Sequence, residues 1–150
     1  MPITVGTLGR LHAVNYRGRD VVFSFKSSEL ILTSVLPNVV RHTWTPTHWR
    51  LYTARMTDSY AVSRDTWPTG PIASISETPE TVRVQMGELC IEATRDPFHL
   101  RYFAADDRLF LEEVDAGGLS WSYWEYTLRY RLAAEDHFYG MGQANQLVDH

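Results

Sequence analysis

Apolar and polar residues alternate along much of this chain with the two-residue period of a β-strand. The alternation over residues 82–86 moves from even to odd positions across Gly87-Glu88 and then continues to residue 93. A two-residue hairpin turn with glycine first produces this switch and keeps both apolar sets on one face. The pattern therefore predicts a hairpin with one buried face and one face in water.

Similar segments recur along the chain and predict further short strands. The candidate strands cover residues 8–16, 20–26, 30–36, 39–45, 98–102, 109–111 and 126–132, and turn-forming residues separate them at Gly18, Ser27-Ser28, Pro37-Asn38, Asp106-Asp107 and Gly117-Gly118. The last segment alternates most regularly, which predicts that Tyr126, Leu128, Tyr130 and Leu132 face the core. Many short strands at about ten-residue spacing predict an all-β fold, an antiparallel β-sandwich with little or no helix.

Two segments depart from this pattern. Thr45 or Thr47 could cap a short helix over residues 46–58, with Trp49, Tyr52 and Met56 on one side, and a structured loop is the alternative. Residues 63–71 are polar and contain proline and glycine, which predicts a surface connection.

Composition narrows the class of protein. A chain of 150 residues with 44% hydrophobic content suits one domain, residues 1–150, with a sizeable core. The net charge of −4 and the absence of a basic stripe argue against a nucleic-acid partner. No apolar run is long enough to span a membrane and no secretory signal is visible, so we expect a cytoplasmic protein. The single cysteine, Cys90, excludes an internal disulfide and is expected to be a small strand residue.

The residues that could carry chemistry are few. Trp44, Trp49 and Trp67 are weak candidates for stacking on a sugar ring, although core filling or an interface is the favoured interpretation. The six histidines, at positions 12, 42, 48, 99, 137 and 150, show no metal-ligand spacing, so we expect neither a metal nor a cofactor. Glu112-Glu113 and Asp106-Asp107 are adjacent pairs that cannot converge on one strand face, and we expect them to be solvated charges.

The most specific string lies near the end of the chain, where His137, Phe138, Tyr139, Gly140, Met141, Gly142 and Gln143 follow Glu135-Asp136. It resembles a Phe-Tyr-Gly-Leu-Gly-Glu-like stretch of glycoside hydrolase family 31, the α-glucosidases and α-xylosidases. Residues 37–41, 59–62 with 67–68, 81–93 and 96–100 are similar to further segments of that family, in the same order. Gln143 departs from the glutamate of many members, which changes the charge of this string.

The resemblance implies a fold and a role. The fold would be the family's N-terminal, galactose mutarotase-like super-sandwich, with residues 137–143 at the junction to a catalytic (β/α)8 barrel beyond His150. The partners would be that barrel and, through the full enzyme, an α-linked oligosaccharide. Retaining hydrolysis needs two carboxylates about 5 Å apart. The family's nucleophile string, Trp-x-Asp-Met-Asn-Glu, does not occur in this sequence, so we assign no catalytic residue and expect the isolated chain to be inactive.

Three further expectations follow. An exposed apolar patch is expected near residues 135–150, and a second copy of the chain could cover it in solution. A stand-alone carbohydrate-binding β-sandwich module is the main alternative function. A mutarotase-like enzyme is another, and it would need a histidine and a carboxylate that converge on a pocket.

Overall fold

The computed structural model describes residues 6–46, 73–114, 118–121 and 126–132, and within these ranges the chain forms thirteen β-strands and no helix. The strands are β1 (Gly6–Thr7), β2 (Ala13–Arg17), β3 (Asp20–Ser24), β4 (Ser28–Leu36), β5 (Val39–Pro46), β6 (Ser74–Glu77), β7 (Thr81–Met86), β8 (Leu89–Arg95), β9 (Phe98–Phe103), β10 (Leu109–Glu113), β11 (Leu119–Trp121), β12 (Tyr126–Leu128) and β13 (Tyr130–Arg131). The predicted all-β class is confirmed.

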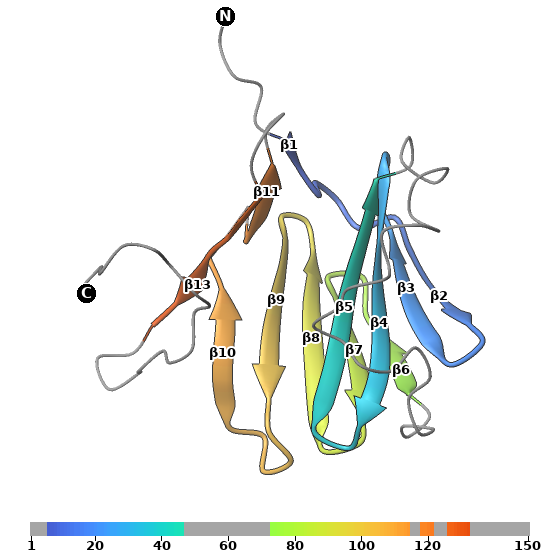
Figure 1. Ribbon diagram of the computed structural model, residues 1–150, viewed down its shortest axis with the longest axis vertical. Coiled ribbons are helices and arrows are strands. Elements are labelled where there is room, and N and C mark those ends of the chain that lie inside the picture. The colour runs from blue at the N-terminus through green and yellow to red at the C-terminus, as the bar shows by residue number, and fades with distance from the viewer. Residues whose placement is uncertain (1–5, 47–72, 115–117, 122–125, 133–150) are drawn as a thin grey trace, which may run out of the picture.

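The strands pair antiparallel into three sheets (Figure 1). A four-stranded sheet has the order β2-β3-β4-β5, and a six-stranded sheet has the order β13-β10-β9-β8-β7-β6. A small sheet of β1, β11 and β12 lies beside them. Sequential neighbours pair throughout most of both larger sheets, which is typical of antiparallel hairpins.

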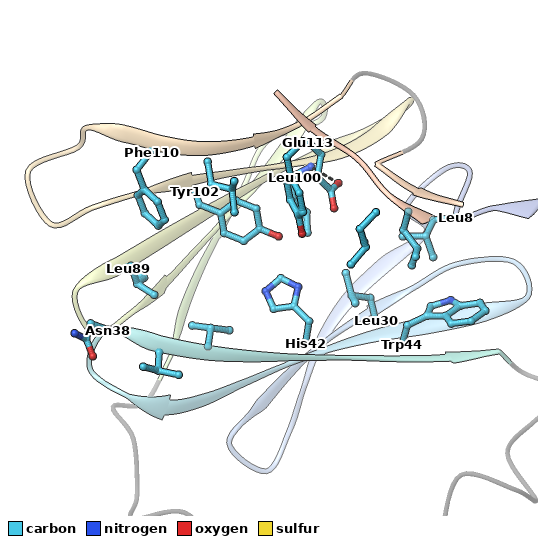
Figure 2. A pocket seen from close by; sticks show the side chains of 16 residues that line it. Leu8, Leu30, Asn38, His42, Trp44, Leu89, Leu100, Tyr102, Phe110 and Glu113 are labelled. Atoms are coloured by element: carbon cyan, nitrogen blue, oxygen red, sulfur yellow. Dashed lines mark hydrogen bonds between the residues drawn. The ribbon is translucent and has the colours of Figure 1, made fainter. Parts of the chain in front are cut away.

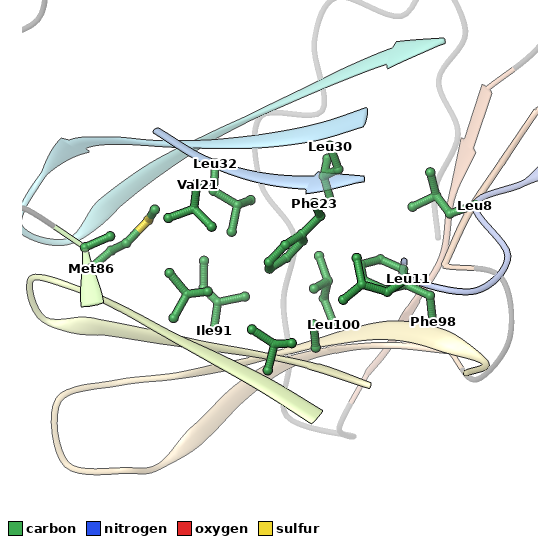
Figure 3. Packing of buried hydrophobic residues seen from close by; sticks show 14 of the residues in the cluster. Leu8, Leu11, Val21, Phe23, Leu30, Leu32, Met86, Ile91, Phe98 and Leu100 are labelled. Atoms are coloured by element: carbon green, nitrogen blue, oxygen red, sulfur yellow. The ribbon is translucent and has the colours of Figure 1, made fainter. Parts of the chain in front are cut away.

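The core fills the space between the two larger sheets (Figure 3). Phe23 and Leu32 point inward from the four-stranded sheet, and Ile91 and Leu100 point toward them from the six-stranded sheet. All four side chains are almost completely buried. Burial of one such side chain stabilises the fold by about 1.5–3 kcal/mol, so this layer supplies much of the driving force for folding.

The hairpin predicted from the switch of alternation is present as β7 and β8. Met86 lies opposite Leu89, and Val82 lies opposite Ala93, so the apolar positions of both strands share the inner face. Gly87 has a φ of 63°, in the left-handed region that glycine adopts most easily. The glycine at the first turn position is therefore required by the backbone.

The opposite face of this hairpin carries charged side chains. Glu92 forms ion pairs with two arginines. Its Oε2 lies 3.7 Å from Arg83 Nε, and its Oε1 pairs with Arg101. Arg83 Nε–H also donates to Cys90 Sγ at 3.4 Å. The prediction of one buried and one polar face is confirmed, and Cys90 is a small buried strand residue, as expected.

Strands β3, β4 and β5 match the predicted strands of the first third of the chain, but the prediction of one strand over residues 8–16 is wrong. Only β2, from Ala13, is a strand there. Gly9 has a φ of 70°, which interrupts the extended backbone, while Leu8 and Leu11 are both buried. The N–H of Leu11 donates to the carbonyl of Arg95 at 2.8 Å and fastens this segment to the end of the six-stranded sheet.

The prediction of one continuous strand over residues 126–132 is also wrong. The segment divides into β12, which pairs with β11, and β13, which pairs with β10. Between them the N–H of Arg129 donates to the carbonyl of Gly118 at 2.8 Å. Leu128 and Leu132 are 59% and 58% exposed, so they are not core residues. The alternation predicted that these side chains face the core. They are exposed because the chain passes here from the small sheet to the six-stranded sheet, and no described layer covers them.

Strands β9 and β10 confirm the two predictions before that point. Phe98 opens β9 after the turn at Asp96-Pro97, whose peptide bond is cis. The turn at Asp106-Asp107 is closed by the N–H of Ala104, which donates to the carbonyl of Arg108 at 3.0 Å. The helix or loop predicted over residues 46–58 lies outside the described residues except for Pro46, which ends β5, and the connection predicted over residues 63–71 lies outside them entirely.

Candidate functional site

A cleft of about 450 Å³ lies between the two larger sheets, at the side formed by β5, β9, β10 and β13. Most of its wall is apolar, and it includes Leu30, Val40, Leu100 and Leu111. Three exposed apolar side chains, Val39, Phe110 and Leu128, also line it and form its rim. A space of this size and lining is typical of small-ligand pockets, in which a few polar groups orient the ligand.

Polar side chains from opposite sheets converge in this cleft. Figure 2 shows His42 pointing from β5 toward Tyr102 of β9 and Glu113 of β10. The ring centroids of His42 and Tyr102 are 5.6 Å apart. Tyr130 of β13 also lines the cleft. The four groups are 11 to 88 positions apart in the sequence, and His42 on the four-stranded sheet meets the other three because the two sheets face each other.

Glu113 is the most deeply placed charged group of the cleft, and the expectation that it is a solvated charge is wrong. Its residue is 4% exposed, because β10 turns this side chain toward the core. One carboxylate oxygen accepts the N–H of Leu100 at 2.9 Å. Burial raises the pKa of Glu113 from 4.5 to about 7, and the hydrogen bond from Leu100 opposes this increase.

The position of Glu113 follows from the end of a strand ladder. The register of β9 with β10 ends where Arg101 lies opposite Glu112. At the next position β10 has no backbone pairing to β9, and the Glu113 side chain accepts the Leu100 N–H instead. Gly118 packs against this side chain, since a Cβ at that position would lie 2.5 Å from Glu113 Cδ. Only glycine fits there without displacing the carboxyl group.

The pKa of His42 is shifted in the opposite direction from that of Glu113. The His42 residue is partly exposed at the mouth of the cleft, and desolvation of its ring by the apolar wall lowers its pKa from 6.5 to about 4. Burial also raises the pKa of Tyr102 and of Tyr130. At pH 6 all four groups are therefore uncharged, and the cleft is a neutral environment with hydrogen-bonding capacity.

Of the residues predicted for a site, only Trp44 lies within the described ranges. It is in β5, packs against the core, and its ring centroid is 4.6 Å from that of Trp121. This contact joins the four-stranded sheet to the small sheet. Trp49, Trp67 and the string from His137 to Gln143 lie outside the described residues, so their roles stay predictions.

The convergence of His42 with Glu113 was not predicted from the sequence. The one available signal was the alternation of β10, which places Glu113 on the same face as Leu111 and Leu109. That signal shows which face a residue occupies, whereas contact with His42 depends on the packing of two sheets. A mutarotase-like enzyme would need such a histidine and carboxylate in one pocket, and the cleft supplies both residue types.

The described residues that line the cleft do not supply the pair of carboxyl groups that retaining glycoside hydrolysis uses. That reaction uses two carboxyl groups about 5 Å apart. Glu113 is the single carboxyl group among the described residues that line the cleft. Within the described ranges no cluster of three histidine, cysteine or acidic residues could hold a metal ion. None of the described segments forms a helix long and apolar enough to cross a membrane.

Comparisons with known proteins place the fold. No protein-family model matches the chain, and no curated protein matches it either. A glycoside hydrolase family 31 dextranase from Flavobacterium johnsoniae, solved with isomaltotriose, is similar with a TM-score of 0.65 and 23% identity. The match covers 76% of this chain and 14% of the dextranase.

A second similar structure is the cycloalternan-forming enzyme from Listeria monocytogenes, solved with a pentasaccharide substrate. Its TM-score is 0.60 at 19% identity, over 83% of this chain and 11% of that enzyme. The chain therefore spans a small part of the length of both enzymes. At these identities the likeness shows a shared fold, and it confirms at that level the resemblance seen in the sequence.

Proposed function

We propose that this chain is the N-terminal, non-catalytic β-sandwich domain of an α-glucosidase-like member of glycoside hydrolase family 31. The observation that carries this proposal is the fold match to 14% of a family 31 dextranase. The glycine-containing string over residues 137–143 supports it independently, because the string resembles one of that family. The domain would support a catalytic barrel in the rest of the parent enzyme and shape the edge of its sugar site.

This role accounts for the chemistry that the chain has. The sequence lacks the family's nucleophile string, and the cleft has one carboxyl group where hydrolysis needs two. The parent would act on an α-linked oligosaccharide, with its catalytic residues in the barrel. Trp44, half-buried against Trp121, would then contribute to packing rather than to sugar stacking.

The natural reading frame provides the decisive test. We expect it to continue for several hundred residues after His150 and to encode a barrel with the nucleophile string. The full protein should hydrolyse p-nitrophenyl α-glucoside or isomaltose, while residues 1–150 alone should not. A natural stop after His150 would overturn the proposal and favour a stand-alone carbohydrate-binding module.

Calorimetry of the isolated chain separates these two functions. We expect no saturable heat when maltose or isomaltotriose is titrated into residues 1–150 up to about 10 mM, an upper limit that corresponds to very weak binding. Saturation at about 1 mM or below would support the carbohydrate-binding module instead.

A mutarotase-like activity is the second candidate, because His42 and Glu113 line one cleft. The apolar wall argues against it, since a pyranose has several hydroxyl groups and would leave most of them without partners. Polarimetry tests this directly with freshly dissolved α-D-glucose. We expect the optical rotation to change at the uncatalysed rate, and an acceleration that disappears in His42→Phe would support the mutarotase instead.

A further inference from the structure

We propose that the cleft between the two larger sheets binds a small, uncharged aromatic ring compound with one hydrogen-bonding group. Its rings would lie between the apolar walls, and its polar group would meet Glu113 and His42 (Figure 2). The proposal does not depend on the family assignment.

The size and lining of the cleft determine the ligand's body. Its volume of about 450 Å³ lies in the range of 300–1,000 Å³ that is typical of small-ligand sites. Tyr102 and Phe110 form one aromatic wall, with ring centroids 6.4 Å apart at 49°. Val40 and Leu30 line the opposite wall, from β5 and β4. A flat ring system suits such walls because it buries a large apolar area with little conformational entropy loss.

The polar groups at the centre determine the ligand's chemistry. A carboxyl group can form several hydrogen bonds, and among the described residues Glu113 accepts one, from Leu100. His42 projects into the same space from the opposite sheet. A single hydroxyl or amine on the ligand can therefore be satisfied in the cleft. A charged group would be disfavoured, because the same walls keep His42 and Glu113 uncharged at pH 6.

Three compounds with the same ring system test these statements: 2-naphthol, naphthalene and 2-naphthoate. Calorimetry and competition at pH 6 should show saturable binding of one 2-naphthol per chain. Naphthalene should bind about three- to tenfold more weakly, because it lacks the hydrogen-bonding group. The 2-naphthoate anion should bind at least about tenfold more weakly than 2-naphthol, since its charge would lose water without a cationic partner.

Matched substitutions locate the site. Val40→Phe extends an aromatic ring into the cleft and should weaken 2-naphthol binding by about tenfold or more. Ile75→Phe makes a comparable change at a half-buried core position of β6 that does not line the cleft, and it should leave binding within about twofold. If Val40→Phe fails to fold, Leu111→Phe in β10 makes the same test from the other sheet.

Each outcome decides the proposal. Absence of saturable binding would mean that polypeptide fills the cleft and would overturn it. Equal effects of the Val40 and Ile75 substitutions, or binding of 2-naphthoate as tight as that of 2-naphthol, would also overturn it. None of these results bears on the reading frame after His150, so failure here leaves the proposed function intact.

Discussion

Glu113 and His42 should contribute to the pH dependence of stability with opposite signs. Replacing either residue should therefore expose the contribution of the other. Folding raises the pKa of Glu113 from 4.5 to about 7, so its contribution is complete below pH 4.5 and is lost as the pH rises through 7. Folding lowers the pKa of His42 from 6.5 to about 4, so its contribution is complete above pH 6.5 and is lost as the pH falls through 4.

Between pH 4.5 and 6.5 the two effects have opposite signs. In this range the unfolded pair holds one proton, on His42, and the folded pair also holds one, on Glu113. Glu113→Gln removes one effect and retains a carbonyl acceptor for Leu100 N–H. Its free energy of unfolding should therefore rise with pH relative to the wild type over this range, by well under about 1.4 kcal/mol per pH unit, because the His42 residue is partly exposed and solvent screens its effect. His42→Phe should show the opposite slope.

Urea unfolding followed by tryptophan fluorescence at half-unit pH intervals measures these slopes. Only the difference from the wild type matters, because the remaining titrating groups contribute equally to each variant. Glu112→Gln is the matched control, since this neighbouring carboxylate faces the solvent side and pairs with Arg131 at 3.5 Å. Wild-type and Glu113→Gln profiles that run parallel would refute the reasoning. The double variant Glu113→Gln/His42→Phe should lack both contributions, and a profile that keeps the slope of either single variant would refute the assignment of opposite signs.

Two further pairs of substitutions test the packing around the cleft and in the core. Gly118→Ala should lower the free energy of unfolding by about 1–3 kcal/mol, because the added Cβ would displace the Glu113 side chain. Gly18→Asn is its control, at an open turn position with a φ of 63°, and should change the free energy of unfolding by less than about 1 kcal/mol. Ile91→Ala, at a fully buried position, should lower the free energy of unfolding by about 2–5 kcal/mol. Leu132→Ala, at an exposed position, should lower it by less than about 1 kcal/mol. Urea unfolding measures all four variants, and equal losses within either pair would contradict the burial of these residues.

The sequence predicted the parts of the fold that local rules determine. The β7–β8 hairpin follows from a switch in alternation and one glycine, and both are visible in the letters of the chain. Residues 8–16 and 126–132 were predicted less well, because alternation does not show where a strand leaves its sheet. Gly9 interrupts the first segment, and a change of pairing partner near Arg129 interrupts the second.

The cleft could not be predicted by the same rules. Alternation places Glu113 on the inward face, but its burial depends on β13, Gly118 and the opposite sheet. Contact between His42 and Tyr102 joins residues 60 positions apart on different sheets. A single sequence contains no direct signal for such a pair, whereas an acidic residue at an apolar position of an alternating strand does indicate a buried acid.

The ladder alone does not explain why position 113 carries an acid. Glutamine would accept the Leu100 N–H equally well and would not titrate. The carboxyl group adds a proton, and burial makes it hold that proton over the same pH range in which burial makes His42 release one. The buried Glu113 and the partly exposed His42 thus leave the cleft neutral, and their contributions to the pH dependence of stability oppose each other between pH 4.5 and 6.5. A histidine and a carboxylic acid in one apolar cleft are therefore better understood as a mutually compensating pair than as two separate defects of the core.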